Sequence, residues 1–160
     1  MDKASFTKAV TAYQDTVYRI TLHSLGNPQD ADDAVQEVFL RLFRQEAAFD
    51  GEEHLRRWLL RVAVNVCHDM RKSPWWRRRT TLNEAAELPV FDRPEESTLY
   101  ETVMDLPEKY RVVLDLFYYE ELSTGEIAEM LGLTQTAVTT RLSRARALLK
   151  ERLGEVWLDD

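Results

Sequence analysis

Apolar residues recur every three or four positions through most of the chain, and this spacing predicts amphipathic helices. The first helix is expected to end near Ser24, where a Gly-Asn-Pro tripeptide interrupts it, and the second begins with Asn27 or Asp30 as its cap. After a short polar loop at residues 49–54, a third helix is expected over residues 55–72. Enough aromatic and branched residues point inward for the three to pack as one bundle. These positions are Phe6, Val10, Tyr13, Val17 and Ile20 in the first helix, Ala31, Ala34, Val35, Val38, Phe39, Leu42 and Phe43 in the second, and Leu55, Trp58, Leu59, Val62, Val66 and Met70 in the third.

A second group of helices is predicted after a mixed, partly acidic stretch that contains two prolines and is typical of a linker. A short helix carries Leu99, and Pro107 is expected at the first position of the next helix, where its missing amide costs nothing. The fold is therefore predicted to be all-α, with small helical domains at residues 1–78 and 94–160 joined by a linker at residues 79–93. The core positions expected before residue 122 are Leu99, Val103, Tyr110, Val113, Leu114 and Phe117.

Residues 122–153 predict two helices joined by a tight turn. Ser123 is placed to cap the first helix, and Glu126 three residues on completes a capping box. Gly132 ends that helix because glycine reaches the left-handed conformation without steric cost, and Thr134 can cap the second helix. The apolar faces of the pair are Ile127, Ala128 and Leu131, followed by Val138, Leu142, Ala145 and Leu149.

The outer face of that second helix carries hydroxyls and arginines. Arginine can bond a guanine edge with two hydrogen bonds, and threonine offers a hydroxyl or a methyl group to base edges. A short helix, a glycine turn and such a helix are typical of a DNA-binding helix-turn-helix. Spacing alone leaves open a solvated helical hairpin whose arginines keep it soluble. The outer positions are Thr136, Thr140, Ser143 and Arg144, flanked by Thr139, Arg141 and Arg146, and the cationic run is Arg141, Arg144, Arg146, Lys150 and Arg152.

The third helix and its extension form a second basic region. Asp69 is the expected counterion there, and Trp75 and Trp76 lie inside the basic run. Cations mixed with planar rings suit single-stranded or melted nucleic acid, where bases stack and phosphates need neutralising. The alternative is a solvated basic face with tryptophans covering the end of the bundle. The cations are Arg56, Arg57, Arg61, Arg71, Lys72, Arg77, Arg78 and Arg79.

Composition bounds the class of protein. The chain has 160 residues, 44% hydrophobic and 31% charged, which suits one or two small soluble domains. Its single cysteine, Cys67, excludes an intramolecular disulfide and fits a reducing cytoplasm. We expect no secretory signal and no membrane span. A net charge of −7 is unusual for a DNA-binding protein, but acids concentrate in the second helix and linker, and bases in the two regions above.

No constellation of catalytic residues stands out. His23, His54 and His68 are scattered, and Cys67 and His68 would point about 100° apart on a helix, which is poor for chelation. No glycine-rich phosphate loop, nucleophile elbow or zinc-protease motif is present. We therefore expect no enzyme, no metal and no cofactor.

The order of the segments resembles that of the extracytoplasmic-function group of bacterial sigma factors, the smallest of the sigma family. The stretches that carry the resemblance are YQDTVYRI (13–20), DADDAVQEVFLRLF (30–43), LRRWLLRVAVNVCHDMRK (55–72) and LPEKYRVVLDLFYYEELSTGEIAEMLGLTQTAVTTRLSRARALLKERL (106–153). They cover nearly everything but the linker. The resemblance implies an alternative sigma factor that binds core RNA polymerase, directs promoter-specific initiation at minus-35 and minus-ten elements, and aids DNA melting.

The resemblance also implies a role for each block. The second helix would dock on the clamp helices of the polymerase largest subunit through Asp30, Asp33, Gln36 and Glu37. The third helix and the preceding loop would read the melted minus-ten strand, with Asn65 on the non-template strand and residues 49–54 around a flipped base. The last helix would enter the major groove of the minus-35 element. The minus-ten residues are Phe49, Asp50, Gly51, Glu52, His54, Arg56, Arg57, Arg61 and Asn65, and the minus-35 residues are Thr124, Thr136, Thr139, Thr140, Arg141, Ser143 and Arg144.

Departures from the family pattern bear on the minus-35 preference. Thr136 stands at a usual glycine, Thr139 at an often basic position, Thr140 at a common serine and Thr124 at a usual tyrosine, whereas Arg141 and Arg144 match. The group also implies an anti-sigma partner, often membrane-anchored, for a chain that is itself cytoplasmic.

Two other classes remain as alternatives. A self-sufficient helix-turn-helix repressor would need a dimerisation element and usually a ligand pocket, and it leaves the basic third helix without a role. An anti-sigma or adaptor protein would not need arginines on the last helix. Binding to core RNA polymerase separates these readings from the leading one.

Overall fold

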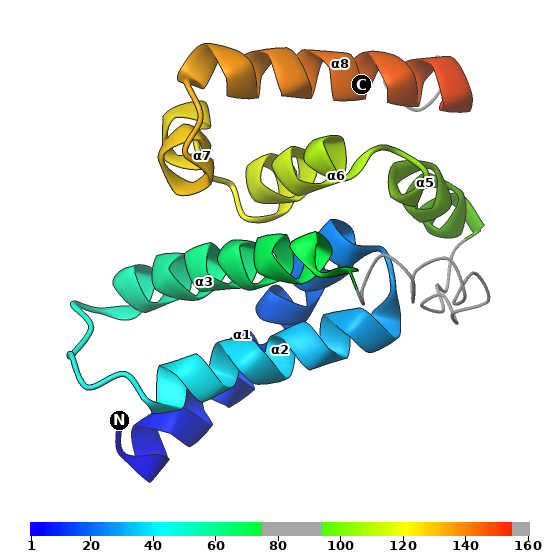
Figure 1. Ribbon diagram of the computed structural model, residues 1–160. Helices are drawn as coiled ribbons and strands as arrows, with labels where there is room; N and C mark the ends of the chain where they lie inside the picture. The colour runs from blue at the N-terminus through cyan, green and yellow to red at the C-terminus, as the bar shows by residue number, and fades with distance from the viewer. Residues whose placement is uncertain (75–93, 155–160) are drawn as a thin grey trace. The chain divides into compact units, whose positions relative to one another are not determined.

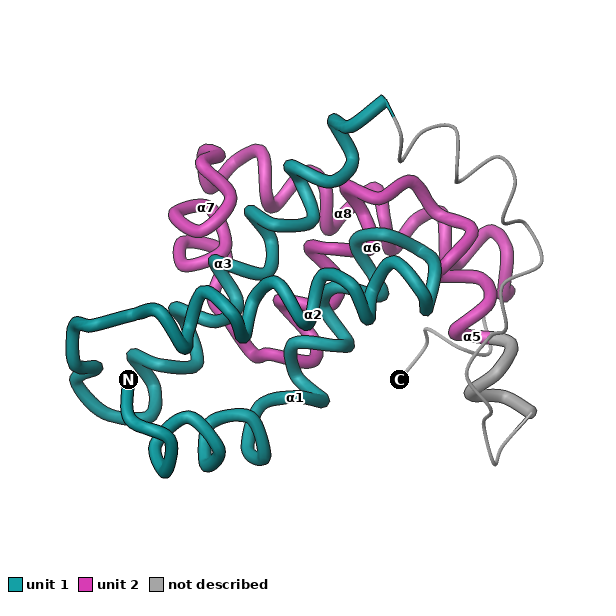
Figure 2. The backbone as a smooth tube through the Cα atoms, turned by 60° about the horizontal axis from the view of Figure 1, so that its bottom comes forward, with its two compact units in different colours: residues 1–87 teal, residues 88–160 magenta. Residues whose placement is uncertain are grey.

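A computed structural model of the chain describes residues 1–74 and 94–154, and all regular secondary structure in these two ranges is helical (Figure 1). The chain divides into two compact units, residues 1–87 and 88–160 (Figure 2). The predicted all-α fold with two small helical domains is confirmed. The boundary between the units falls within residues 79–93, which lie outside the described ranges, so the limits of the linker stay a prediction.

The N-terminal unit is a bundle of α1 (Lys3–Leu25), α2 (Pro28–Phe43) and α3 (Glu52–Lys72), each packed against the other two. Burying one aliphatic side chain of the size of valine or leucine contributes roughly 1.5–3 kcal/mol, so the apolar centre accounts for most of the cohesion. The bundle also buries Cys67. The side chains with no exposed surface at its centre include Val17, Ile20, Val38, Leu42, Leu59 and Leu60.

The turn between α1 and α2 is built by Gly26 and Asn27. Gly26 has φ 75°, the left-handed region that favours glycine, and its N–H donates to the carbonyl of Leu22. The side-chain oxygen of Asn27 accepts hydrogen bonds from the backbone N–H groups of Gln29 and Asp30 at 2.9 and 3.1 Å. Of the two candidate caps Asn27 is therefore the one used, and Asp30 lies in the first turn of α2.

The third helix begins at Glu52, three residues earlier than the sequence pattern predicted. Gly51 with φ 90° precedes it, so residues 52–54, which we expected in a loop, are helical. Two acidic residues, Glu52 and Glu53, occupy the first turn, where the helix dipole favours negative charge.

The C-terminal unit contains α5 (Pro94–Met104), α6 (Glu108–Leu114), the π-helical turn η1 (Asp115–Tyr119), α7 (Thr124–Leu131) and α8 (Gln135–Leu153). The longest of these, α8, packs against α5, α6 and α7. Pro107 is the N-cap of α6 and not its first helical residue, a difference of one position. The π-helical turn that follows α6 was not predicted.

No helix within the described ranges combines the length and the apolar character needed to cross a membrane.

Candidate nucleic-acid interface

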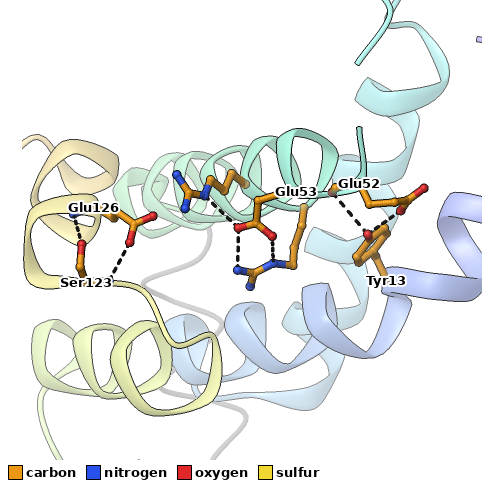
Figure 3. Close-up of polar contacts among 7 residues, drawn as sticks. Tyr13, Glu52, Glu53, Ser123 and Glu126 are labelled. Atoms are coloured by element: carbon orange, nitrogen blue, oxygen red, sulfur yellow. Dashed lines mark hydrogen bonds and ion pairs between the residues drawn. The ribbon is translucent and has the colours of Figure 1, made fainter. Parts of the chain in front are cut away.

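The turn that leads into α7 has the predicted capping box. The backbone N–H of Glu126 donates to the Ser123 hydroxyl at 3.1 Å, and the N–H of Ser123 donates to the Glu126 carboxylate at 3.0 Å (Figure 3). Gly132 ends α7 with φ 67°. These local signals confirm the predicted helix, glycine turn and second helix.

The orientation of α8 follows from its apolar face. The Thr134 hydroxyl caps it by accepting from the N–H of Ala137 at 3.1 Å. The four apolar positions predicted to face inward, Val138, Leu142, Ala145 and Leu149, are all buried. The opposite side is therefore turned to solvent. The exposed predicted residues there are Thr136, Thr139, Ser143 and Arg144, while Thr140 and Arg141 are half-buried, as is Thr124 at the start of α7.

Arg146 has a different environment from the arginines predicted to surround the outer face. Its Nε donates to the phenol oxygen of Tyr118 at 2.6 Å, and its guanidinium carbon lies 5.5 Å from the ring centres of both Phe117 and Tyr118. Arg146 therefore braces α8 against η1. Its side chain is nevertheless exposed, so its place in the cationic run stays a prediction.

A side-chain bridge links the first residues of α7 and α8. The Nε2 group of Gln135 donates to the Thr124 hydroxyl at 2.8 Å, and the Thr139 hydroxyl donates to the backbone carbonyl of Gln135, also at 2.8 Å. Gln135 was absent from the predicted site. Its position as the first residue of the second helix was the signal in the sequence that could have marked it.

The segment before α3 is a packed corner in which aromatic rings meet. The Phe49 ring contacts His54 and Trp58 edge-to-face, with ring centres 5.3 and 5.4 Å apart. The Nδ1 atom of His54 accepts from the backbone N–H of Asp50 at 2.8 Å, which requires that nitrogen to be unprotonated. This corner brings together Phe49, Asp50 and His54, three of the residues predicted around a flipped base.

The basic face of α3 is partly neutralised from its own first turn. The Glu53 carboxylate accepts from Arg56 and from Arg57, with N–O distances of 2.9 to 3.2 Å (Figure 3). Hydrogen bonds from Arg56 and then from Arg57 lower the pKa of Glu53. Glu53 is therefore a counterion of this basic region. The sequence pattern predicted only Asp69, since it predicts a loop at residues 52–54.

Further along α3, the exposed predicted residues share one side. His54, Arg57, Arg61 and Asn65 follow one another at spacings of three, four and four residues, and all four are exposed. Glu52 is turned to α1, since its carboxylate accepts from the Tyr13 hydroxyl at 2.7 Å. The predicted Trp75, Trp76 and residues 77–79 lie outside the described ranges.

The acidic residues of α2 do not form a single surface. Asp33 and Gln36 are exposed, and Glu37 is partly exposed and pairs with Arg41 at 3.1 Å. Asp30 is only 1% exposed, so it does not lie on the outer face to which the sequence assigned it. The reason is its register, because Asp30 shares the inward side of α2 with Ala34 and Val38.

The outer side of α2 continues into apolar side chains. Leu40 and Phe43, four and seven residues beyond Gln36, are 47% and 50% exposed. The Phe43 ring also packs edge-to-face on Phe6, with ring centres 5.2 Å apart. Phe43 was expected to face fully inward and instead lies at the edge of the bundle.

The described parts of the two units offer no evident metal centre. Within residues 1–74 and 94–154, no group of three or more histidine, cysteine, aspartate or glutamate side chains is arranged to hold a metal ion. The candidate nucleic-acid interface consists of hydroxyls, amides and cations on helix surfaces.

Comparison with known proteins identifies both units. The family described as Sigma-70 region 2 matches residues 9–77, and the family described as Sigma-70, region 4 matches residues 97–149. The ECF RNA polymerase sigma factor SigW of Bacillus subtilis (strain 168) is 30% identical over 172 residues, which covers 97% of this chain and 92% of that protein. The RNA polymerase sigma-H factor of Pseudomonas aeruginosa is 28% identical over 170 residues, covering 95% and 88%.

Solved structures show the same architecture. The sigma factor RpoE in complex with the anti-sigma factor NepR from Bartonella quintana matches with a TM-score of 0.75 over 93% of this chain and 96% of that chain. Its sequence identity of 18% limits that likeness to the fold. CnrH in complex with the cytosolic domain of CnrY matches with a TM-score of 0.65 at 28% identity, covering 95% and 89%.

Proposed function

Since the chain belongs to the extracytoplasmic-function sigma factors of the sigma-70 family, we propose that separate faces of its two units read the two elements of a promoter. The family membership means that this protein is an alternative sigma factor that directs promoter-specific transcription. The resemblance found in the sequence is confirmed. The residues that carry each contact are our proposal.

The observation that carries the proposal is the orientation of α8. Burial of Val138, Leu142, Ala145 and Leu149 turns the opposite face, with its hydroxyls and Arg144, away from the core. The N-terminal part of such a helix fits the major groove of a duplex. We assign the minus-35 element to this face, with contacts from Thr124, Thr136, Thr139, Thr140, Arg141, Ser143 and Arg144.

The exposed side of α3 and the corner before it would read the minus-ten element. Arg57 and Arg61 supply charge for the phosphates of a melted strand, and Asn65 on the same side supplies an amide for a base edge. The corner around Phe49 and His54 would hold a base that has left the stack, whose unpairing costs a few kcal/mol. Arg56, Gly51, Asp50 and Glu52 complete the set assigned here.

The outer side of α2 would dock on the clamp helices of the largest polymerase subunit. Asp33, Gln36 and Glu37 supply the polar contacts, and the exposed Leu40 lies on the same side. The buried Asp30 is left out of this surface. Acidic docking to polymerase also reconciles DNA recognition with a net charge of −7, because polymerase supplies much of the DNA affinity.

An anti-sigma factor is the second protein partner that we propose. The matched RpoE structure contains one, and the matched CnrH structure contains a cytosolic domain of CnrY. The relatives of this chain are transcription initiation factors rather than catalysts, and we extend this to a cytoplasmic protein with no enzymatic activity of its own.

The test is co-elution of the purified chain with core RNA polymerase, followed by transcription from a pool of promoter fragments. Stable co-elution with selective initiation is the expected result, and the selected fragments deliver both promoter elements. Failure to bind core polymerase, together with tight binding of duplex DNA by the chain alone, would contradict this proposal and support the helix-turn-helix repressor considered above.

A further inference from the structure

Gln135 lies at the end of α8 from which recognition helices contact base edges. It is the first residue of the helix, its side chain is exposed, and the N-terminal residues of a recognition helix are those that contact base edges. Its side-chain amide donates from Nε2 to the Thr124 hydroxyl at 2.8 Å. This hydrogen bond restrains the amide before any DNA arrives.

The hydrogen-bonding capacity that remains matches one base. A glutamine amide has two N–H donors and one carbonyl acceptor. When Thr124 takes the N–H that points away from Oε1, the other N–H and the carbonyl oxygen remain side by side. The major-groove edge of adenine requires this pair, since its N7 accepts and its N6 amino group donates.

The neighbouring hydroxyls support this division of roles. The Thr139 hydroxyl already donates its proton to the Gln135 backbone carbonyl at 2.8 Å, so toward a base it can accept or offer its methyl group. The Thr124 hydroxyl accepts from Gln135 and keeps its own proton, which a DNA phosphate oxygen can accept.

We propose that Gln135 reads an adenine of the minus-35 element and that Thr124 is the positioning residue that orients its amide. This proposal rests on the placement of α8 in the major groove that we propose above. The proposal adds Gln135 as a base contact. It also adds a hydrogen-bonded link in which Thr124 contacts a phosphate and Gln135, and Gln135 contacts the base.

The experiment uses the full chain with core RNA polymerase and a promoter pool randomised across the minus-35 element. The wild-type protein should prefer adenine at one position. Gln135→Ala should lower that preference about 5- to 150-fold, the range of one bidentate base contact, and leave the other positions unchanged. Gln135→Glu should shift the preference toward cytosine, whose amino group donates to a carboxylate.

Thr124 is tested by a pair of variants. Thr124→Val removes the hydroxyl at similar size and should weaken the adenine preference at the same base position. Thr124→Ser keeps the hydroxyl and should keep the wild-type preference. Unfolding curves show which variants fold. Selection of a minus-35 element by the wild type, with the same base preferences in Gln135→Ala and Gln135→Glu, would overturn this inference alone. A wild-type chain that selects no minus-35 element would overturn the proposed function as well.

Discussion

The Glu53 carboxylate accepts two hydrogen bonds from the Arg56 guanidinium, from Nε to Oε2 at 3.2 Å and from Nη2 to Oε1 at 3.0 Å. The Nε of Arg57 donates to the same Oε1 at 2.9 Å. Glu53 remains 57% exposed, so these pairs add little to the free energy of unfolding. In the minus-ten site that we propose they would weaken binding, because the carboxylate takes donors that a DNA phosphate would otherwise take.

Glu53→Gln is therefore expected to tighten binding of a single-stranded minus-ten oligonucleotide by the holoenzyme. The gain should be about 0.2–1 kcal/mol, the range of an exposed ion pair, and binding should fall more steeply with salt. Fluorescence anisotropy across a salt series measures both quantities.

Asp69→Asn is the control, because it removes the same charge from an exposed residue of α3 that lies outside the proposed contact set. It should change the affinity less than Glu53→Gln. Weaker binding by Glu53→Gln would mean that Glu53 orients the arginines for DNA and does not compete with it.

Asn65→Ala is expected to impair promoter opening while leaving recognition of the minus-35 duplex intact. Asn65 lies on the exposed side of α3 with Arg57 and Arg61, whereas the proposed duplex contacts lie on α7 and α8 in the other unit. The permanganate reactivity of unpaired thymines measures opening, and competition with a minus-35 duplex measures recognition. Unchanged opening in Asn65→Ala would remove this residue from the minus-ten site.

Arg144 and Arg146 lie two residues apart on α8, and we expect their substitution by alanine to affect different properties, base discrimination and stability respectively. Arg146→Ala loses its hydrogen bond to Tyr118 and its contact with two rings, so unfolding of the C-terminal unit should be easier by about 1 kcal/mol. Arg144→Ala should leave the stability within about 0.5 kcal/mol of wild type and reduce discrimination at one base pair by about 1–3 kcal/mol.

Urea unfolding and promoter competition on the same two variants give the comparison. Loss of base discrimination without loss of stability in Arg146→Ala would show that the Tyr118 contact opens when DNA binds.

The helix-turn-helix could be predicted in detail because its determinants are local. The capping box joins Ser123 and Glu126 across three residues, Gly132 acts through its own backbone, and the buried face of α8 follows a helical period. Each signal depends on residues within one or two turns. The start of α3 was missed for a related reason, since Gly51 and two acids read as a loop although acids also stabilise a first turn.

The details of the site depended on tertiary contacts that no periodicity encodes. Arg146 meets Tyr118 across 28 positions of sequence, and the π-helical turn that carries Tyr118 has no sequence signal of its own. Gln135 meets Thr124 across 11 positions. Asp30 is a different case, because its spacing of four residues from Ala34 already put it on the inward side of α2, and its charge alone suggested a surface position. Residue type therefore predicted the face, and the structure decided which members of the face are available.

Tyr13 predicts a pH dependence that can be checked without DNA. Its hydroxyl donates to the Glu52 carboxylate at 2.7 Å, which ties α1 to the first turn of α3. Burial of the phenol and then this hydrogen bond raise the pKa of Tyr13 from 10.0 to about 12. Between these two values the folded chain keeps a proton that the unfolded chain has lost, so the free energy of unfolding falls as the pH rises through that window.

Tyr13→Phe keeps the ring and removes the titrating group, so its free energy of unfolding should decline less steeply above about pH 10 than that of the wild type. Below that pH the variant should be less stable by about 0.5–1.5 kcal/mol, the net contribution of one hydrogen bond. Urea unfolding at a series of pH values gives both numbers. Tyr119→Phe, which removes an exposed hydroxyl from the other unit, should keep the wild-type decline. If the free energy of unfolding declined equally with pH in wild type and Tyr13→Phe, the hydrogen bond between Tyr13 and Glu52 would not form in solution. That bond would then not connect the first turn of α3 to α1.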